Sequence, residues 1–310
     1  MGIVCSLTFY FLLNISTYLI MTSINDNFYN DFSFSFHFFL IFFCIFSFYL
    51  LMETKKGPGI IEKNSKGSLS IIDETVINNN ETKNISLSNS PLVITKSDLV
   101  LKENCDICNI SDLPLRSHHC KKCGLCVLKY DHHCTFINTC IGEDNHLKFI
   151  FFLFSQNIAI ILALYGLIKT IRLFFENNKS ASFIDIPGAI FFFIFILSLY
   201  FIYCSILFFF HAYLVCTNQT SYEIFHKDKC PYLHIFKDER NKILNERGIE
   251  VEPTFAYHPF DSGIINNLKL LISKLFKNNY KINWEEIYFE NLKTNNIYRN
   301  FCDNEYWSCF

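Results

Sequence analysis

The chain has 310 residues, of which 51% are hydrophobic and 36 are phenylalanine, and its formal net charge is −2. The apolar residues are gathered into long runs, which excludes an ordinary soluble globule. The nearly balanced charge gives no reason to expect a nucleic-acid partner.

Four apolar runs are each long enough to cross ~30 Å of hydrocarbon, which takes a helix of about 20 residues. These runs are residues 3–21, 33–52, 149–168 and 187–215. None of them has a charged residue near its middle. Only two residues precede the first run, and neither is basic, so we interpret it as a membrane helix instead of a signal peptide.

The basic residues are distributed unevenly between the segments that join these runs. Twelve Lys and Arg lie in 53–148 and twelve after residue 216, against three in 169–186 and none in 22–32. Because cytoplasmic loops carry an excess of Lys and Arg, both termini and the large middle segment are predicted to be cytosolic. We expect a multi-pass protein of an endomembrane, the Golgi or the ER, or of the plasma membrane.

The polar segments have distinct compositions, and they complete the predicted domain organisation. The expected order is 1–52, membrane helices; 53–104, a partly disordered cytosolic linker; 105–148, a Cys-rich domain; 149–215, membrane helices; and 216–310, a cytosolic tail. The tail has apolar residues at helical spacing from Ile264 to Phe276, with Lys residues among them, which predicts an amphipathic helix. Such a helix suits the membrane interface, and packing on the protein's own cytosolic domain fits equally well.

The Cys-rich segment carries seven of the fourteen cysteines, together with four histidines. They are Cys105, Cys108, His118, His119, Cys120, Cys123, Cys126, His132, His133, Cys134 and Cys140. A reducing cytosol disfavours disulfides, whereas two-residue gaps between cysteines are typical of zinc ligands. Two closed tetrahedral sites need eight ligands of these eleven, and the spacing does not decide which three remain.

Asp131-His132-His133-Cys134, which follows this array and precedes Asn138-Thr139-Cys140-Ile141-Gly142 and Asn145, resembles the DHHC protein S-acyltransferase family. The resemblance implies two interleaved zinc sites. One would be Cys105, Cys108, His119 and Cys126, and the other Cys120, Cys123, His133 and Cys140. His118 would then be a surface histidine, while His132 and Cys134 would be free for chemistry.

The resemblance also implies a palmitoyltransferase activity. Cys134 would take a long-chain acyl group from acyl-CoA and pass it to membrane-proximal cysteines of substrate proteins. If the segment 131–134 is extended, His132 and Cys134 share one face, so His132 can act as a base for a thiol whose ordinary pKa is about 8.5. Asp131 would fix the imidazole tautomer. Candidate partners for the CoA phosphates are Arg116, Lys121, Lys122, Lys129 and Lys148.

Two segments of the tail also resemble family motifs. Thr220-Ser221-Tyr222-Glu223 is similar to the family's TTxE motif, which braces the Cys-rich domain; the same residues also suit a helix cap. His258-Pro259-Phe260, with Asn267 after it, resembles the Asn-Pro-aromatic motif with His in the first position. Within the core, Thr135-Phe136 replaces the usual Pro-Trp.

The expected fold class is an all-α polytopic membrane protein. It would have four transmembrane helices and a small cytosolic zinc-binding Cys-rich domain of short β-hairpins and loops. An inactive zinc-bearing scaffold and a membrane-anchored ubiquitin ligase are the alternatives, and the intact Asp131 to Cys134 group disfavours both. The membrane helices lack the buried charges of ion pathways, which disfavours a transporter.

Overall fold

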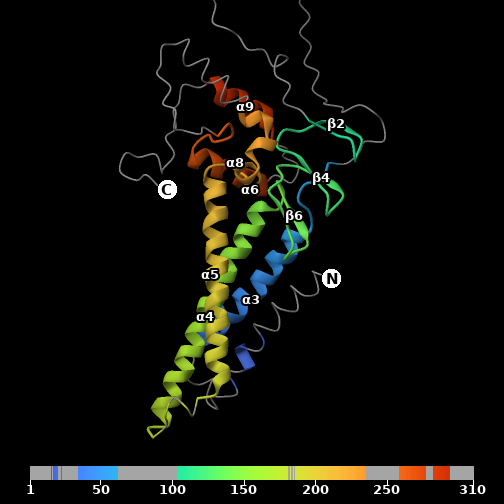
Figure 1. Ribbon diagram of the computed structural model, residues 1–310. Helices are drawn as coiled ribbons and strands as arrows, with labels where there is room; N and C mark the ends of the chain where they lie inside the picture. Colours follow the sequence, from blue (N-terminus) through green and yellow to red (C-terminus); the bar gives the residue numbers. More distant parts are fainter. Residues whose placement is uncertain are drawn as a thin grey trace, which may run out of the picture.

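Three long apolar helices dominate the computed structural model (Figure 1). The structure describes residues 34–61, 103–180, 186–234, 258–276 and 282–293, with isolated positions in 15–22 and at 182 and 184. The helices are α3 (Phe34–Lys55), α4 (His146–Asn177) and α5 (Gly188–Cys216). Each is long and apolar enough to cross a membrane. The run 3–21 lies almost entirely outside the described residues, so the fourth membrane helix remains a prediction.

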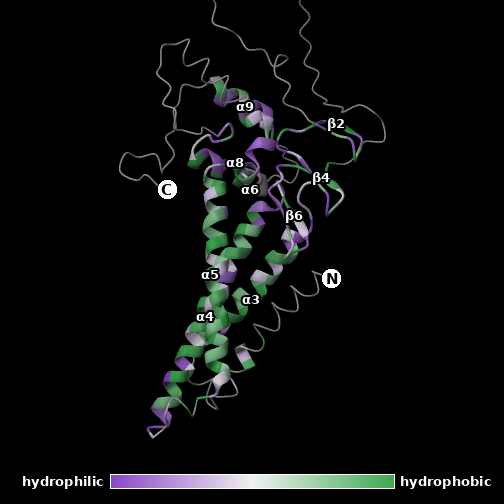
Figure 2. Cartoon of the chain, viewed as in Figure 1, coloured by the Kyte–Doolittle hydropathy of each residue, from purple (hydrophilic) through white to green (hydrophobic). Residues whose placement is uncertain are grey.

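The three helices pack with α4 in the middle, since α4 contacts both α3 and α5. Within its most apolar stretch, 56% of α4 is buried by protein, against 28% of α3 and 17% of α5. The outer faces of α3 and α5 therefore expose apolar side chains along their length (Figure 2). Such faces suit hydrocarbon, where a helix satisfies its own backbone hydrogen bonds.

Small residues on α4 allow the helices to approach closely. Ala159, Ala163 and Gly166 are all buried. Ala163 packs in one apolar cluster with Phe36 of α3 and Leu197 of α5. This stripe of small residues serves helix packing in the described part of the chain.

The Cys-rich segment forms three separate two-stranded antiparallel hairpins at one end of the helices (Figure 1). Their strands are β1 (Glu103–Cys105), β2 (Ile110–Leu113), β3 (His118–Cys120), β4 (Leu125–Val127), β5 (His132–Cys134) and β6 (Thr139–Ile141). Each turn contains one residue with a positive φ, namely Asn109, Gly124 and Asn138. These are the residue types that tolerate that conformation. Isolated hairpins of this size are marginal, so other interactions must hold them.

Gly142 and Asn145 join the hairpins to the membrane helices. The Asn145 side chain accepts a hydrogen bond from the Gly142 N–H at 2.8 Å and donates to the carbonyl oxygens of Thr54, at 2.8 Å, and Cys140, at 2.9 Å. A Cβ at position 142 would lie 2.5 Å from the Pro58 carbonyl oxygen, so this close approach requires glycine. The end of α3, β6 and the start of α4 are thereby fixed together.

The tail folds back on the Cys-rich segment. It contributes α6 (Ser221–Phe225), the 3₁₀ helix η2 (Lys227–Lys229), α8 (Ile264–Phe276) and α9 (Trp284–Lys293). One apolar cluster joins it to the hairpin region through Leu115, Cys230, Tyr232, Phe260, Ile282, Trp284, Tyr288 and Leu292. This second core lies outside the membrane helices and has its own aromatic centre.

Helix α8 confirms the predicted amphipathic helix. Leu271 is buried against Ile150 of α4 and Val215 of α5, so one edge packs on the protein. Ile265 is 70% exposed and Ile272 is 47% exposed on another edge. One edge of α8 therefore packs on the ends of α4 and α5 and not on a separate cytosolic domain, and a contact of the exposed edge with the membrane interface remains a prediction.

Candidate functional site

Two groups of four Cys and His side chains form within the hairpins. The first is Cys105, Cys108, His119 and Cys126, and the second is Cys120, Cys123, His133 and Cys140. In each group the possible ligand atoms all lie within 4.8 Å of one another. These are the two sets that the family resemblance implies.

The distances inside the groups fit tetrahedral metal sites. His119 Nδ1 lies 3.2 Å from Cys108 Sγ, and His133 Nδ1 lies 3.3 Å from Cys123 Sγ. Neighbouring ligands of one zinc ion are separated by about 3.3–3.8 Å, since Zn–N is about 2.0 Å and Zn–S about 2.3 Å. All the cysteines of both groups are free thiols, so no disulfide competes.

The two groups share one hairpin because adjacent residues of a strand point to opposite faces. On β3, His119 belongs to the first group and Cys120 to the second. His119 also faces Cys126 across the hairpin, and His133 faces Cys140. Metal ions in these groups would tie the three hairpins into one unit.

Strand β5 places its two histidines in different surroundings: His133 belongs to a metal group, and His132 does not. His133 points toward the sulfur atoms, while His132 Nδ1 lies 2.6 Å from Asp131 Oδ2. Burial opposes a charge on His132, but the hydrogen bond to Asp131 and the neighbouring Cys134 outweigh it and raise the pKa of the imidazole to about 9. The extended backbone thus has the alternation expected from the sequence.

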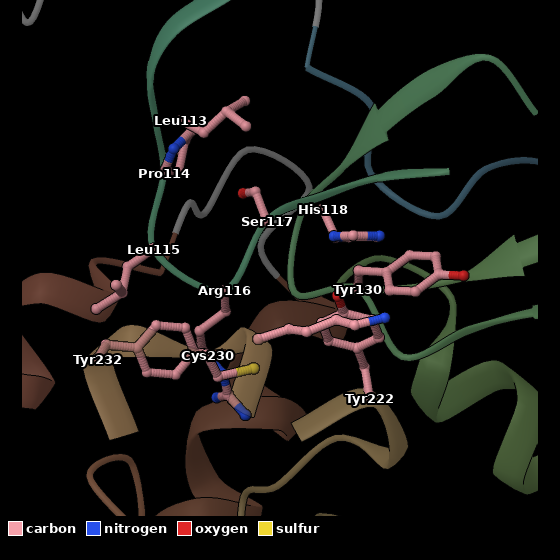
Figure 3. Close-up of a pocket in the computed structure, with 11 residues that line it drawn as sticks. Leu113, Pro114, Leu115, Arg116, Ser117, His118, Tyr130, Tyr222, Cys230 and Tyr232 are labelled. Carbon is pink, nitrogen blue, oxygen red and sulfur yellow. The ribbon is translucent and has the colours of Figure 1, made fainter. Parts of the chain in front are cut away.

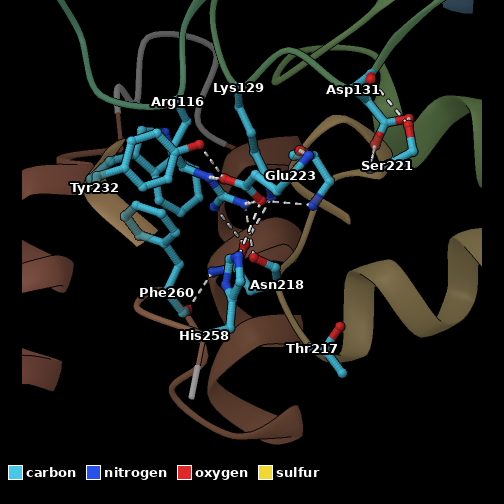
Figure 4. Close-up of polar contacts among 12 residues, drawn as sticks. Arg116, Lys129, Asp131, Thr217, Asn218, Ser221, Glu223, Tyr232, His258 and Phe260 are labelled. Carbon is cyan, nitrogen blue, oxygen red and sulfur yellow. Dashed lines mark hydrogen bonds and ion pairs between the residues drawn. The ribbon is translucent and has the colours of Figure 1, made fainter. Parts of the chain in front are cut away.

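Asp131 is buried, and Ser221 of α6 holds its carboxylate in place. The Ser221 N–H donates to Asp131 Oδ1 at 2.7 Å, and the Ser221 hydroxyl donates to Oδ2 at 2.9 Å (Figure 4). Burial alone would raise the pKa of Asp131, but the hydrogen bond from His132 and the surrounding imidazoles hold it well below its ordinary value. A serine hydroxyl therefore performs this contact where the family motif has threonine.

Cys134 belongs to neither metal group. It is half-buried and packs against apolar side chains at the junction of α3, α4 and β6. They include Leu50, Leu51, Ile137, Ile141, Phe149, Phe152 and Leu153. The thiol therefore lies between the Asp131–His132 pair and the apolar ends of the membrane helices.

Glu223 caps α6 and braces the Cys-rich segment at the same time. Its side chain completes a capping box with Thr220. Its carboxylate also pairs with Arg116, whose Nε and Nη2 donate at 2.8 and 2.7 Å (Figure 4). Both functions that the sequence left as alternatives for this motif are present.

Arg116 and Lys129 are not on the surface. They are 4% and 2% exposed, and the Arg116 guanidinium lies 4.1 Å from the Phe260 ring centroid. Lys129 donates to Asn218 Oδ1 at 2.9 Å and lies 4.8 Å from the Trp284 ring. Both have a positive φ, of 70° and 43°, a conformation that persists only where surrounding contacts hold it. As a correction to the expected CoA contacts, both charges are engaged inside the protein.

The other three expected CoA contacts lie closer to solvent. Lys121 and Lys122 are exposed on the turn between β3 and β4. Lys148 is half-buried at the start of α4, and its Nζ lies 3.6 Å from a Glu53 carboxylate oxygen.

The His-Pro-Phe segment anchors the tail to this cluster. His258 Nε2 lies 3.3 Å from Glu223 Oε2, and Phe260 is fully buried. Asn267 donates to the Cys216 carbonyl oxygen at 2.7 Å, at the end of α5. The histidine that replaces the usual asparagine thus reaches the same carboxylate as Arg116.

His118 is half-buried in a ring stack, which corrects its interpretation as a surface histidine. Its ring centroid lies 4.5 Å from that of Tyr222 and 5.1 Å from that of Tyr130. The three rings and Lys229 line a shallow pocket between the hairpins and the segment that follows α5 (Figure 3).

Comparison with known proteins agrees with this geometry. Residues 100–228 match the family model described as DHHC palmitoyltransferase. These residues are a DHHC palmitoyltransferase domain. The DHHC domain ends just beyond the Thr220–Glu223 motif, so it includes α4, α5 and α6.

Several relatives are similar over the DHHC domain and its surroundings. A ZDHHC-type protein of Dictyostelium discoideum is 32% identical over 210 residues, which is 64% of this chain and 41% of that protein. Palmitoyltransferase ZDHHC15 of Xenopus laevis is 36% identical over 127 residues, 39% of this chain and 35% of its own length. Palmitoyltransferase ZDHHC23-A of Danio rerio is 32% identical over 125 residues, which is 39% of this chain and 29% of that protein. The chain spans less than half the length of these relatives.

Proposed function

We propose that this protein is a protein S-acyltransferase, a palmitoyltransferase that moves a long-chain acyl group from acyl-CoA through acyl-Cys134 to cysteines of substrate proteins. The observation that carries the proposal is the environment of Cys134. Its thiol is left out of both metal groups and lies beside His132, which pairs with the buried Asp131, at an apolar surface.

In the first step His132 accepts the thiol proton of Cys134 on Nε2, because Nδ1 is bound to Asp131. The thiolate attacks the thioester carbonyl carbon, and the CoA thiolate leaves and takes the proton. In the second step His132 accepts the proton of a substrate thiol, the resulting thiolate attacks the carbonyl carbon of acyl-Cys134, and Cys134 leaves as a thiolate that recovers the proton from His132. The raised pKa of His132 favours its protonated form while the Cys134 thiolate attacks.

The two Cys3His groups have the donor set of structural zinc sites, which are closed to substrate. Bound zinc would supply folding free energy to a region with short hairpins and little apolar core. Their thiolates give each site a net charge of about −1, which would not assist formation of a neighbouring thiolate.

The acyl chain of the donor would lie against the apolar cluster beside Cys134, between the membrane helices. We assign the CoA phosphates to Lys121, Lys122 and Lys148, since their ammonium groups are nearer to solvent than those of Arg116 and Lys129. The substrate cysteines would be membrane-proximal, because the thiol lies at the ends of the membrane helices.

The proposed arrangement has four membrane helices, with both termini and the DHHC domain in the cytosol. Three apolar helices and the excess of basic residues in 53–148 and after 216 support it. We place the protein in an endomembrane, the Golgi or the ER, or in the plasma membrane.

The test is the intact mass of purified protein after incubation with palmitoyl-CoA. We expect the wild-type chain to gain an acyl group that hydroxylamine removes, and Cys134→Ser to gain none. Cys216→Ser is the matched control, since Cys216 also lies near the cytosolic end of a membrane helix. Labelling of Cys134→Ser at the wild-type level would contradict the proposal.

A further inference from the structure

A third group of metal-ligating side chains occurs among the residues that the structure describes, apart from both Cys-rich groups. Asp131, His146 and His211 each offer one ligand atom, and these three atoms lie within 4.8 Å of one another. The three residues are 1%, 2% and 3% exposed. The transfer reaction as derived above uses Asp131 and leaves the two buried imidazoles without a role.

Three different elements hold these side chains in place. Asp131 is fixed by Ser221 of α6 and by its own N–H, which donates to the Ile141 carbonyl oxygen at 2.9 Å. His146 is the first residue of α4, and its N–H donates to the Gly142 carbonyl oxygen at 3.0 Å. His211 of α5 packs perpendicular to the Phe149 ring at 5.0 Å. The three ligands are therefore preorganised before any ion arrives.

The two imidazoles already have the separation of ligands on one ion. His146 Nε2 lies 3.0 Å from His211 Nδ1, where a single proton joins the two rings. In a tetrahedral zinc site with Zn–N of about 2.0 Å, two nitrogen ligands lie about 3.3 Å apart. Two histidines and one carboxylate also form the set found where zinc keeps its fourth position open.

We propose that Asp131, His146 and His211 form a third site, for a divalent transition metal ion such as zinc. Binding needs no net loss of a proton, because the shared proton moves to the other nitrogen of its imidazole. Among the described residues, the hydrogen bond to Asp131 Oδ1 comes from the Ser221 N–H, which leaves a lone pair of this oxygen for the ion.

An ion at this site inhibits acyl loading, and this consequence rests on the proposed function. The ion competes with His132 for the Asp131 carboxylate. It also brings a double positive charge next to the His132 ring, whose centroid lies 5.6 Å from that of His211. The His132 imidazole then loses the orientation that its contact with Asp131 gives it, so it is held less well toward Cys134.

The first experiment counts metal ions in the full-length protein purified in detergent and equilibrated with zinc and a weak chelator. Elemental mass spectrometry should find three zinc ions in the wild-type chain and two in both His146→Phe and His211→Phe, which keep an aromatic ring. His226→Phe is the control, because His226 is exposed and also lies in a ring contact, and it should keep three. Two ions in the wild type, or three in every variant, would overturn the site.

Cobalt substitution shows where the third ion is bound and whether the variants are folded. Two equivalents of Co²⁺ should give strong thiolate-to-metal absorption in all four proteins, because both Cys3His groups are intact. The third equivalent should add only weak visible bands in the wild type and the control, because its ligands contain no sulfur. A third equivalent that increases the thiolate band would place the ion on cysteine and overturn the site.

A second experiment separates the site from its consequence. Zinc should lower acyl loading of the wild type by roughly tenfold or more, since an assisting base contributes about 10²–10⁴. Each Phe variant, compared with itself without added zinc, should lose the inhibition. Three ions with unchanged loading would overturn the inhibitory role alone. Three ions with no loading under any condition would contradict the acyltransferase function and leave the site standing.

Discussion

At the scale of single residues, Cys134 has the same side chain as the other cysteines of the Cys-rich segment and differs from them in its surroundings. Six of the seven cysteines from Cys105 to Cys140 lie with a histidine in a metal group, and Cys134 lies with His132 and Asp131. Asp131 in turn depends on Ser221, which is 90 positions away in the sequence. The environment of the thiol is therefore set by a residue beyond the last membrane helix.

Replacing Ser221 tests this dependence. Ser221→Ala removes one hydrogen bond to a charged carboxylate, which contributes about 1.5–3 kcal/mol, so we expect acyl loading to slow by roughly 10- to 100-fold. Ser221→Thr keeps the hydroxyl and should restore most of the rate. The measurement is the single-turnover rate of acylation of Cys134, and equal rates for the Ala and Thr variants would show that the hydroxyl is dispensable.

At the scale of elements, the short hairpins β1 to β6 contain the two groups of Cys and His side chains, in which bound metal would hold them together, and they contact α6. The β3–β4 hairpin contributes ligands to both groups, so the two sites should not be independent. Helix α6, with only five residues, is held by the capping box and by the Arg116–Glu223 pair. Neither element has enough apolar contact to be stable alone.

Removing a ligand from one metal group should weaken both. Cys123→Ala leaves the second group with three ligands, and we expect loss of metal from the first group as well, because β3 and β4 lose their support. The measurement is the thiolate absorption after cobalt substitution, with Cys216→Ala as a control outside both groups. A variant that kept one full Cys3His signal would show that the two sites fold separately.

Removing the Glu223 carboxylate should destabilise the junction between the tail and the hairpins. Glu223→Gln leaves Arg116 buried without its counter-charge, which costs about 3–5 kcal/mol of unfolding free energy. The exposed Glu290→Gln is the matched control and should stay within about 0.5 kcal/mol of wild type. Thermal unfolding of the two variants and the wild type in one detergent measures both changes in unfolding free energy.

The difference in stability between wild type and Glu223→Gln should depend on pH. Burial would raise the pKa of Glu223, but Arg116 and His258 outweigh burial and lower it below the ordinary value of 4.5. A lowered pKa means that the stabilisation is present above 4.5 and is lost as the pH falls. The difference in stability between wild type and Glu223→Gln should therefore narrow in acid, and a difference that widened would contradict the ion-pair explanation.

At the scale of the whole molecule, the membrane helices and the tail together form the surroundings of the site. α3, α4 and α5 bring apolar side chains to Cys134, and the tail adds Phe260 and Trp284 around Arg116. The proposed reaction requires this end of the helices to face the cytosol, where acyl-CoA is present.

A topology experiment tests that requirement. The short loop between α4 and α5 already contains an N-glycosylation acceptor, Asn178-Lys179-Ser180, which should be glycosylated in membranes, because this loop has few basic residues and is predicted to be luminal. The native acceptors Asn80-Glu81-Thr82 and Asn84-Ile85-Ser86, in the segment predicted to be cytosolic, should remain unmodified. The reverse pattern would place Cys134 in the lumen and would contradict the proposed function.

The sequence by itself determined the features that depend on neighbouring residues. An apolar run of about 20 residues predicts a membrane helix, and two-residue gaps between cysteines predict metal ligands, because both patterns act over a few turns of chain. The alternation of His132, His133 and Cys134 on β5 follows from local backbone geometry in the same way.

Only the tertiary structure decided the contacts between distant residues. Arg116 and Lys129 have the positive charge expected of phosphate ligands. Their neighbours in the sequence do not show that Arg116 pairs in the interior with Glu223, 107 positions away, or that Lys129 donates a hydrogen bond to Asn218. His146 and His211 likewise stand alone in the sequence and meet only because α4 packs on α5. Burial and partner choice are set by packing across the whole fold, which spacing along the chain does not encode.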